Sequence, residues 1–169
     1  ERYRELGIQN IRCQCRGYGG ERYGVIPEAA PQGALPGVYL DGARYVRDTV
    51  KLFAGIRDKI GYDVKLIHDV HERVAPPEAV ARELEPFDLL FLEDPVCAEQ
   101  TKWLREIRCH SGVPIAQGEL FNRSIDWRDL ISGHLIDYIR VHISQIGGIT
   151  PARKLQMFAE QYGVRTAWH

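Results

Sequence analysis

Short apolar or alternating runs recur along this chain, separated by stretches with helical spacing. The runs predict strands at Ile8–Cys15, Val64–Val70, Leu89–Leu92, Val113–Gln117, Ile136–Ile143 and Val164–Trp168. The stretches between them predict helices at Asp41–Ile60, Pro76–Leu84, Glu99–His110, Ser124–Ile131 and Thr150–Tyr162. Strands that alternate with helices in this way predict an α/β fold with a parallel sheet and right-handed crossovers.

The helix boundaries follow from local signals. The first long helix is expected to stop at Gly61, after an apolar stripe formed by Val46, Val50, Phe53, Ile56 and Ile60. The last is expected to begin at Thr150, with Pro151 at its first helical position, and to end before Gly163. These signals support a helical reading of both segments.

One segment, Gly17–Leu40, is expected to be a long irregular loop. It is rich in glycine and proline and contains Tyr18, Tyr23 and Tyr39. Loops of this length are uncommon inside a compact domain and are usually functional or disordered. It follows the first predicted strand, on the side where barrel enzymes form their active sites.

Composition narrows the class of protein. Apolar residues make up 44% of the 169 residues and charged residues 27%, as in soluble globular proteins. The net charge of −1 gives no reason to expect binding to nucleic acid or to a membrane. Four cysteines are few for a disulfide scaffold, which favours a cytoplasmic location. A complete parallel barrel needs about 250 residues, so we expect a single partial barrel domain over residues 1–169.

Acidic residues close three of the predicted strands. Asp69, Glu93 and Glu119 follow one another at about one strand–helix unit each. In a parallel barrel the carboxyl ends of the strands meet at one face, so these side chains should lie together. Carboxylates that converge repel one another unless a cation lies between them, and oxygen ligands suit Mg²⁺. The spacing therefore predicts a magnesium site.

Other polar residues lie at the same strand ends. His71 should share the face of Asp69 and could act as a general acid or base, whereas Asp94 should point to the face opposite Glu93. Arg140 and His142 also share a face. Arg140 suits capture of a substrate carboxylate, but an ion pair with one of the acidic residues is an equal alternative.

Two further positions are candidates near the ends of the chain's first and last strands. Arg12 ends the first strand, and Tyr23 lies in the loop that follows. A tyrosine acts as a base only if a neighbouring cation lowers its pKa, so by pattern alone Tyr23 is better explained as a structural loop residue. His169 closes the last predicted strand.

These residues together resemble the mannonate dehydratase family of the enolase superfamily. The stretches that carry the resemblance are IRCQC, the loop ending in Tyr23-Gly24, LIHDVHERV, LEPFDLLFLEDPV, PIAQGELFN, LIDYIRVHISQIGGIT and VRTAWH. The resemblance implies a modified TIM barrel, (β/α)7β, of which this chain covers about strands two to seven without the capping domain. It also implies Mg²⁺ held by Asp69, Glu93 and Glu119.

The resemblance further implies roles for the remaining residues. Tyr23, assisted by Arg12, would remove the C2 proton of D-mannonate, and His71 would protonate the departing 3-hydroxyl to give 2-keto-3-deoxy-D-gluconate. Arg140 and His169 match substrate-contacting positions. This reading makes the chain part of a hydro-lyase whose partner is a small sugar acid, and the full-length protein is expected to be a homo-oligomer.

Two alternatives stay open. One is a related reaction of the same superfamily, such as D-gluconate dehydration or a racemisation in which His169 would be the second base. The other is a non-catalytic paralogue that binds a sugar acid, although all three ligand positions are occupied by carboxylates here.

Overall fold

The chain folds into a six-stranded parallel sheet with helices between the strands. The computed structural model describes residues 2–15, 32–33, 35, 42–72, 74 and 77–169. The strands are β1 (Asn10–Arg12), β2 (Lys65–Asp69), β3 (Leu89–Glu93), β4 (Ile115–Gln117), β5 (Tyr138–Ile139) and β6 (Arg165–Thr166). They pair in sequence order, each parallel to the next. Sequential parallel order is the arrangement of a barrel wall, which confirms the predicted fold class.

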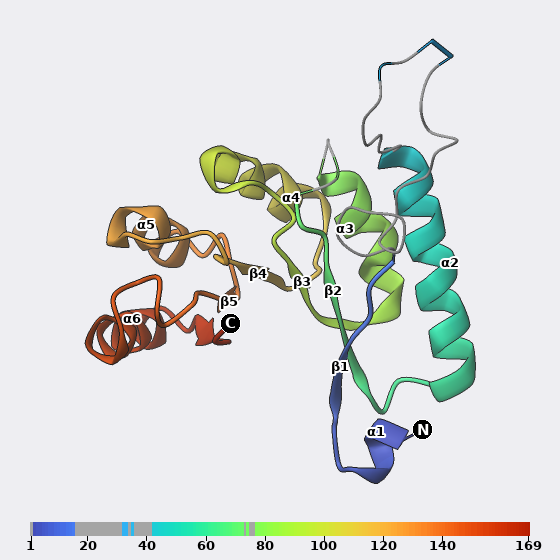
Figure 1. Cartoon of the computed structure of the whole chain (residues 1–169), viewed down its shortest axis with the longest axis horizontal. Coiled ribbons are helices and arrows are strands. Elements are labelled where there is room, and N and C mark those ends of the chain that lie inside the picture. The colour runs from blue at the N-terminus through green and yellow to red at the C-terminus, as the bar shows by residue number, and fades with distance from the viewer. Residues whose placement is uncertain (1, 16–31, 34, 36–41, 73, 75–76) are drawn as a thin grey trace.

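Helices separate the strands and lie around the outside of the curved sheet (Figure 1). They are α1 (Arg2–Glu5), α2 (Gly42–Ile60), α3 (Glu78–Leu84), α4 (Leu104–His110), α5 (Ser124–Ser132) and α6 (Ile149–Gln161), with short 3₁₀ helices η2 (Glu85–Phe87) and η3 (Ala98–Trp103). The segment predicted as one helix from Glu99 is the 3₁₀ helix η3 followed directly by α4, and η3 itself is kinked at Gln100, where φ is −120° and ψ 27°. Among the described residues, no helix is both long and apolar enough to cross a membrane.

The core lies between the sheet and the helices. Phe53 of α2, Leu66 of β2, Leu92 of β3, Ile115 of β4 and Ile139 of β5 are fully buried. Strands β2 to β5 therefore each contribute at least one side chain to a shared apolar layer, and burial of that area is the main force that holds the helices against the sheet. Most of the predicted loop Gly17–Leu40, including Tyr23, lies outside the described residues.

Helix α2 buries a different line of residues from the one its apolar pattern predicts. Tyr45, Thr49, Phe53 and Arg57, spaced by four, are buried. Thr49 donates its hydroxyl to the carbonyl of Tyr45 at 2.8 Å. Of the predicted apolar stripe, only Phe53 belongs to this buried line; the other four residues are partly buried and pack against the core. Polar side chains are tolerated in the buried line because each has hydrogen-bond partners.

Arg57 joins the end of α2 to the segments that begin β2 and β3. Its guanidinium donates to the carbonyl oxygens of Phe87 (2.7 and 2.9 Å), Gly61 (2.9 Å), Val64 (2.8 Å) and Asp88 (3.0 Å). Only 5% of the residue is exposed. One side chain thus satisfies several backbone acceptors at the amino-terminal edge of the sheet.

We expect Arg57→Met to lower the free energy of unfolding by roughly 3 kcal/mol, since the substitution leaves buried carbonyl groups without donors. Urea unfolding of the complete protein measures this change. Arg105→Met, at an exposed position of α4, is the matched control and should change stability little. An Arg57→Met protein as stable as the Arg105→Met protein would contradict the structural role.

Candidate metal centre and active site

The acidic residues meet at the carboxyl ends of the strands. Asp69 is the last residue of β2 and Glu93 the last of β3, and the two are register partners in the sheet. Both are completely buried. Glu119 follows β4 by two residues, and its side chain is 25% exposed. Parallel pairing therefore brings the predicted carboxylates to one face, as their spacing along the chain predicts.

Cationic side chains from the first and fifth strands contact these carboxylates. Arg12 Nη1 lies 3.0 Å from Asp69 Oδ2 and 3.7 Å from Glu93 Oε2. The Nε of Arg140 donates a hydrogen bond to Glu93 Oε1, and its Nη1 donates to the carbonyl of Trp168 at 3.0 Å. Of the two alternatives for Arg140, the structure thus shows the ion pair with an acidic residue.

Histidines complete the cluster. His71 Nε2 lies 2.6 Å from Asp69 Oδ2, and the His71 backbone N–H donates to Asp69 Oδ1 at 3.1 Å. His169 Nε2 lies 3.6 Å from Glu119 Oε1 and 3.9 Å from Glu93 Oε1. Except for Tyr23, which lies outside the described residues, the predicted site residues are therefore brought together.

His71 reaches Asp69 by a turn and not by strand alternation. Strand β2 ends at Asp69, and His71 has a φ of 51°, in the left-handed region. The alternation that was expected to place the two side chains on one face applies only inside a strand. The predicted proximity is right, but its cause is the backbone turn.

Burial and like charge shape the electrostatics of the site. Burial, together with the charge of Glu93, raises the pKa of Asp69 to about 7, although Arg12 and the His71 N–H act in the opposite direction. Burial also lowers the pKa of His169, and the charge of Arg140 adds to that effect. Asp69 is therefore a buried carboxyl beside a like charge, and a bound cation would favour its ionised form.

The residues fit a hard divalent cation. Ligand atoms of Asp69, Glu93 and Asp94 lie within 4.8 Å of one another, and so do those of Asp69, His71 and Glu119. Asp69 belongs to both groups, and between them they contain the three predicted ligands. Glu93 Oε2 is buried and has no hydrogen-bond partner among the described residues. A buried carboxylate oxygen of this kind is suited to coordinate Mg²⁺.

Asp94 corrects one expectation. It was predicted to point away from Glu93, but its carboxylate lies in the same acidic group. Strand β3 ends at Glu93, and Asp94 has a φ of 39°, so alternation no longer governs its direction. Burial raises the pKa of Asp94 well above its usual range. The sequence did carry a signal that Asp94 lies near the acidic cluster, namely its position directly after the end of the strand.

Several residues that contact the acidic cluster or its neighbours were not identified from the sequence. Gln14 Nε2 lies 3.5 Å from Asp69 Oδ2, and the rings of His142 and His169 are 4.0 Å apart. His68, next to Asp69, is buried between the Tyr45 hydroxyl and the carbonyl of Cys13, each at 2.9 Å. Because a carbonyl only accepts, Nδ1 of His68 carries the proton, and Nε2 accepts from Tyr45.

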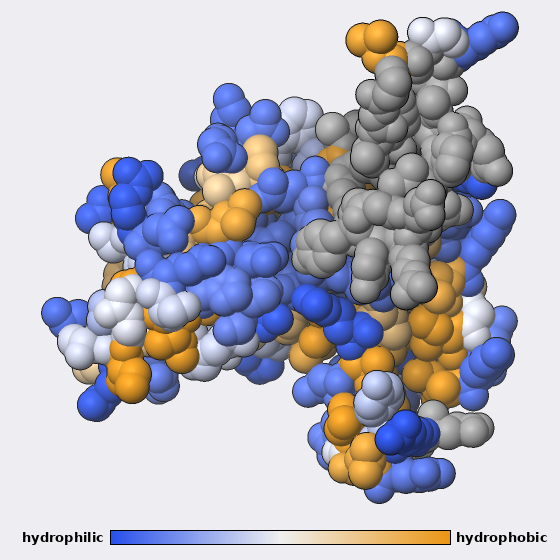
Figure 2. All heavy atoms as spheres, in the orientation of Figure 1, coloured by the Kyte–Doolittle hydropathy of each residue, from blue (hydrophilic) through white to orange (hydrophobic). Residues whose placement is uncertain are grey.

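The surface around the site is polar. Figure 2 shows hydrophilic residues gathered over β4, β5 and the carboxyl-terminal end of the chain. A small cavity of about 200 Å³ opens beside the carboxylates and is lined by His71, Glu72, Asp94, Glu119 and Leu120. A polar substrate would therefore meet polar walls at this face.

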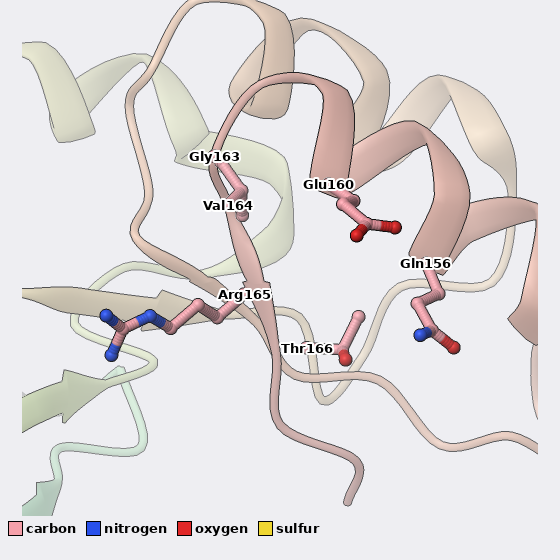
Figure 3. A pocket seen from close by; sticks show the side chains of 6 residues that line it. All are labelled: Gln156, Glu160, Gly163, Val164, Arg165 and Thr166. Atoms are coloured by element: carbon pink, nitrogen blue, oxygen red, sulfur yellow. The ribbon is translucent and has the colours of Figure 1, made fainter.

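A second pocket lies elsewhere. Figure 3 shows it between α6 and β6, with the side chains of Gln156, Glu160 and Thr166 on one side of β6 and that of Arg165 pointing to the other. It adjoins the turn that precedes β6, whereas the acidic cluster follows the strands. Its residues are therefore separate from the candidate site.

Parallel strands in barrel order, with buried carboxylates, arginines and histidines at their carboxyl ends, define part of a barrel domain with an acidic, cation-binding centre. Residues 26–169 match the family described as "Enolase C-terminal domain-like". The chain belongs to this family, and so to the enolase superfamily.

Relatives of known name agree with this assignment. The chain is 46% identical over 181 residues to RspA of Pantoea ananatis and 48% identical over 167 residues to a protein of Enterococcus gallinarum, both named as D-galactonate dehydratase family members. These matches cover 98% of this chain but 43% and 41% of the relatives. The chain thus spans less than half of their length.

Solved structures show the same fold. An enolase of Pantoea ananatis, crystallised with D-gluconate and Mg, superposes with a TM-score of 0.90 at 45% identity, over 99% of this chain and 44% of that one. L-Talarate dehydratase of Polaromonas sp. JS666, complexed with Mg and L-glucarate, gives a TM-score of 0.74 at 25% identity over 99% and 40%.

Proposed function

We propose that the protein is a Mg²⁺-dependent hydro-lyase that dehydrates a six-carbon sugar acid, and that residues 1–169 form part of its barrel domain. The observation that carries this proposal is the buried carboxylate pair Asp69–Glu93 with Glu119 beside it. The relatives crystallised with Mg and sugar acids support the same chemistry.

Asp69, Glu93 and Glu119 would hold the cation. Bound there, Mg²⁺ would act as a Lewis acid toward the substrate carboxylate and so favour loss of the proton at C2. These side chains offer only oxygen atoms, which match the preference of Mg²⁺. Their repulsion in the absence of a cation is partly offset by Arg12 and Arg140.

The other residues would bind substrate and move protons. We assign removal of the C2 proton to Tyr23 with Arg12, as the resemblance implies; Arg12 is at the site, where its positive charge would favour a tyrosinate. His71 would donate a proton to the departing 3-hydroxyl. Arg140 and His169, which flank Glu93, would contact the substrate.

D-Mannonate is the substrate that the sequence resemblance suggests, with 2-keto-3-deoxy-D-gluconate as product. D-Gluconate is the second candidate, favoured by its presence in the Pantoea ananatis structure. We further propose a homo-oligomeric, cytoplasmic protein. The four cysteines are free, as they would be in a reducing compartment.

The test is turnover of D-mannonate, D-gluconate and D-galactonate by the complete protein, measured as 2-keto-3-deoxy acid. We expect activity with Mg²⁺ and its loss in EDTA. Glu119→Gln should lower kcat/KM by about 100-fold, less than at a buried ligand because solvent screens its partly exposed carboxylate. Mg²⁺ binding without turnover of any acid sugar would instead favour the non-catalytic binding role.

A further inference from the structure

Asp94 connects two of the proposed ligands through a side-chain hydrogen bond. Its Oδ1 accepts a hydrogen bond from the backbone N–H of Gly118 at 2.8 Å, and the residue is 4% exposed. Glu93 immediately precedes Asp94, and Glu119 immediately follows Gly118. We propose that Asp94 is a positioning residue that fixes the separation of the Glu93 and Glu119 carboxylates, an inference that rests on the proposed function.

The backbone of Asp94 is held on both sides. Its N–H donates to the carbonyl of Ala116 at 2.9 Å, and its own carbonyl accepts from Glu72 at 3.0 Å. The residue is thus tied to β4 and to the turn that follows β2. Because these hydrogen bonds restrict the backbone of Asp94, its side chain can hold the Gly118 backbone at a fixed distance from β3.

Gly118 is equally constrained. It has a φ of +137°, a conformation that residues with side chains rarely adopt. A Cβ atom there would lie 3.0 Å from Val141 Cγ1 and 3.1 Å from both the Arg140 carbonyl and the Phe121 ring. The backbone at Gly118 is therefore pressed against the end of β5. The hydrogen bond to Asp94 holds the same backbone on the β3 side.

The hydrogen bond and the charge of Asp94 make separable contributions. Oδ2 is buried without a hydrogen-bond partner among the described residues, and the Asp94 carboxylate lies near those of Asp69 and Glu93. An asparagine keeps an acceptor for the Gly118 N–H but removes the charge, whereas an alanine removes both. A positioning role requires only the acceptor.

Mg²⁺ titration by calorimetry of the complete protein tests the inference. We expect Asp94→Ala to raise the Kd for Mg²⁺ by about 10- to 100-fold, the usual cost of losing a residue that orients ligands. Asp94→Asn should stay within about threefold of the wild type, since the hydrogen bond remains. Asp129→Ala, at an exposed position of α5, is the matched control and should bind as the wild type does.

The outcomes are distinct. Wild-type affinity in Asp94→Ala, or a loss in Asp94→Asn as large as in Asp94→Ala, would overturn the positioning role. A merely structural role would lower the melting temperature in EDTA without changing the Kd of the folded protein. If Asp94→Ala does not fold, Asp94→Asn decides, because loss of its Mg²⁺ affinity would refute the inference. A wild-type protein that binds no Mg²⁺ would reject the proposed function itself, and this inference with it.

Discussion

Glu93→Gln is expected to raise the Kd for Mg²⁺ by about 1,000-fold, about 4 kcal/mol of binding free energy, because the substitution removes the charge of a buried oxygen ligand where attraction to a cation is little screened. Glu93 lies at the centre of the site, completely buried, between Arg12, Arg140 and His169. Glutamine has nearly the same shape, so the change removes charge and little packing. Turnover of the sugar acid should fall by a similar factor. Calorimetry with Mg²⁺ and a steady-state assay measure the two quantities.

Two controls are needed to interpret the Glu93→Gln measurement. Glu99→Gln, on the exposed surface of η3, makes the same chemical change away from the site and should leave both quantities unaltered. Circular dichroism should show that Glu93→Gln is folded, since the substitution relieves repulsion with Asp69 while leaving Arg140 less compensated. Mg²⁺ affinity within a few-fold of wild type in folded Glu93→Gln protein would exclude Glu93 as a ligand.

His71→Asn is expected to lower kcat by about 1,000-fold, within the range for loss of a general acid, while the Kd for Mg²⁺ changes little. Asparagine suits the left-handed backbone at this position, where φ is 51°, so the turn after β2 should be preserved. The measurement is kcat for dehydration beside a Mg²⁺ titration. His110→Asn, at an exposed position of α4, is the matched control.

The role of His71 as an acid has a further signature. A 3-deoxy-3-fluoro sugar acid loses fluoride, which needs no proton, so His71→Asn should impair its elimination much less than it impairs dehydration. Equal losses for both substrates would contradict the proton-donor role. A large rise in the Kd for Mg²⁺ would instead make His71 a metal ligand, which its place in a group with Asp69 and Glu119 permits.

The fold was predictable because its signals are local. Each predicted strand is a short apolar or alternating run, and α2 and α6 end close to Gly61 and Gly163 as predicted, although α6 begins at Ile149 with Gly148 as its N-cap and not at Thr150. Strands and helices also alternate without interruption, so few topologies remain. The observed strands are clearly shorter than predicted at β1, β5 and β6, where the paired regions are Asn10–Arg12, Tyr138–Ile139 and Arg165–Thr166. The apolar pattern continues beyond the residues that form backbone hydrogen bonds with a neighbouring strand. The sequence therefore predicts that a strand is present but not where it begins and ends.

The convergence of the acidic residues was predictable for a related reason. Asp69 and Glu93 each end a strand, and parallel pairing carries strand ends to one face whatever the details of packing. Which acidic residue pairs with Arg140 was not predictable. It depends on which carboxylate lies within reach across two strands, and that contact, with Glu93, joins residues far apart in the sequence.

The sequence by itself therefore determined the α/β alternation, the parallel order and the gathering of acidic residues at one edge, because these depend on periodicity and on position within a strand. Only the tertiary structure decided what happens just past the strand ends. There His71 and Asp94 turn back toward the acidic cluster with positive φ, and Asp94 bonds to Gly118. Side-chain alternation stops where the strand stops, and the direction of the next residue is then set by hydrogen bonds to neighbouring segments.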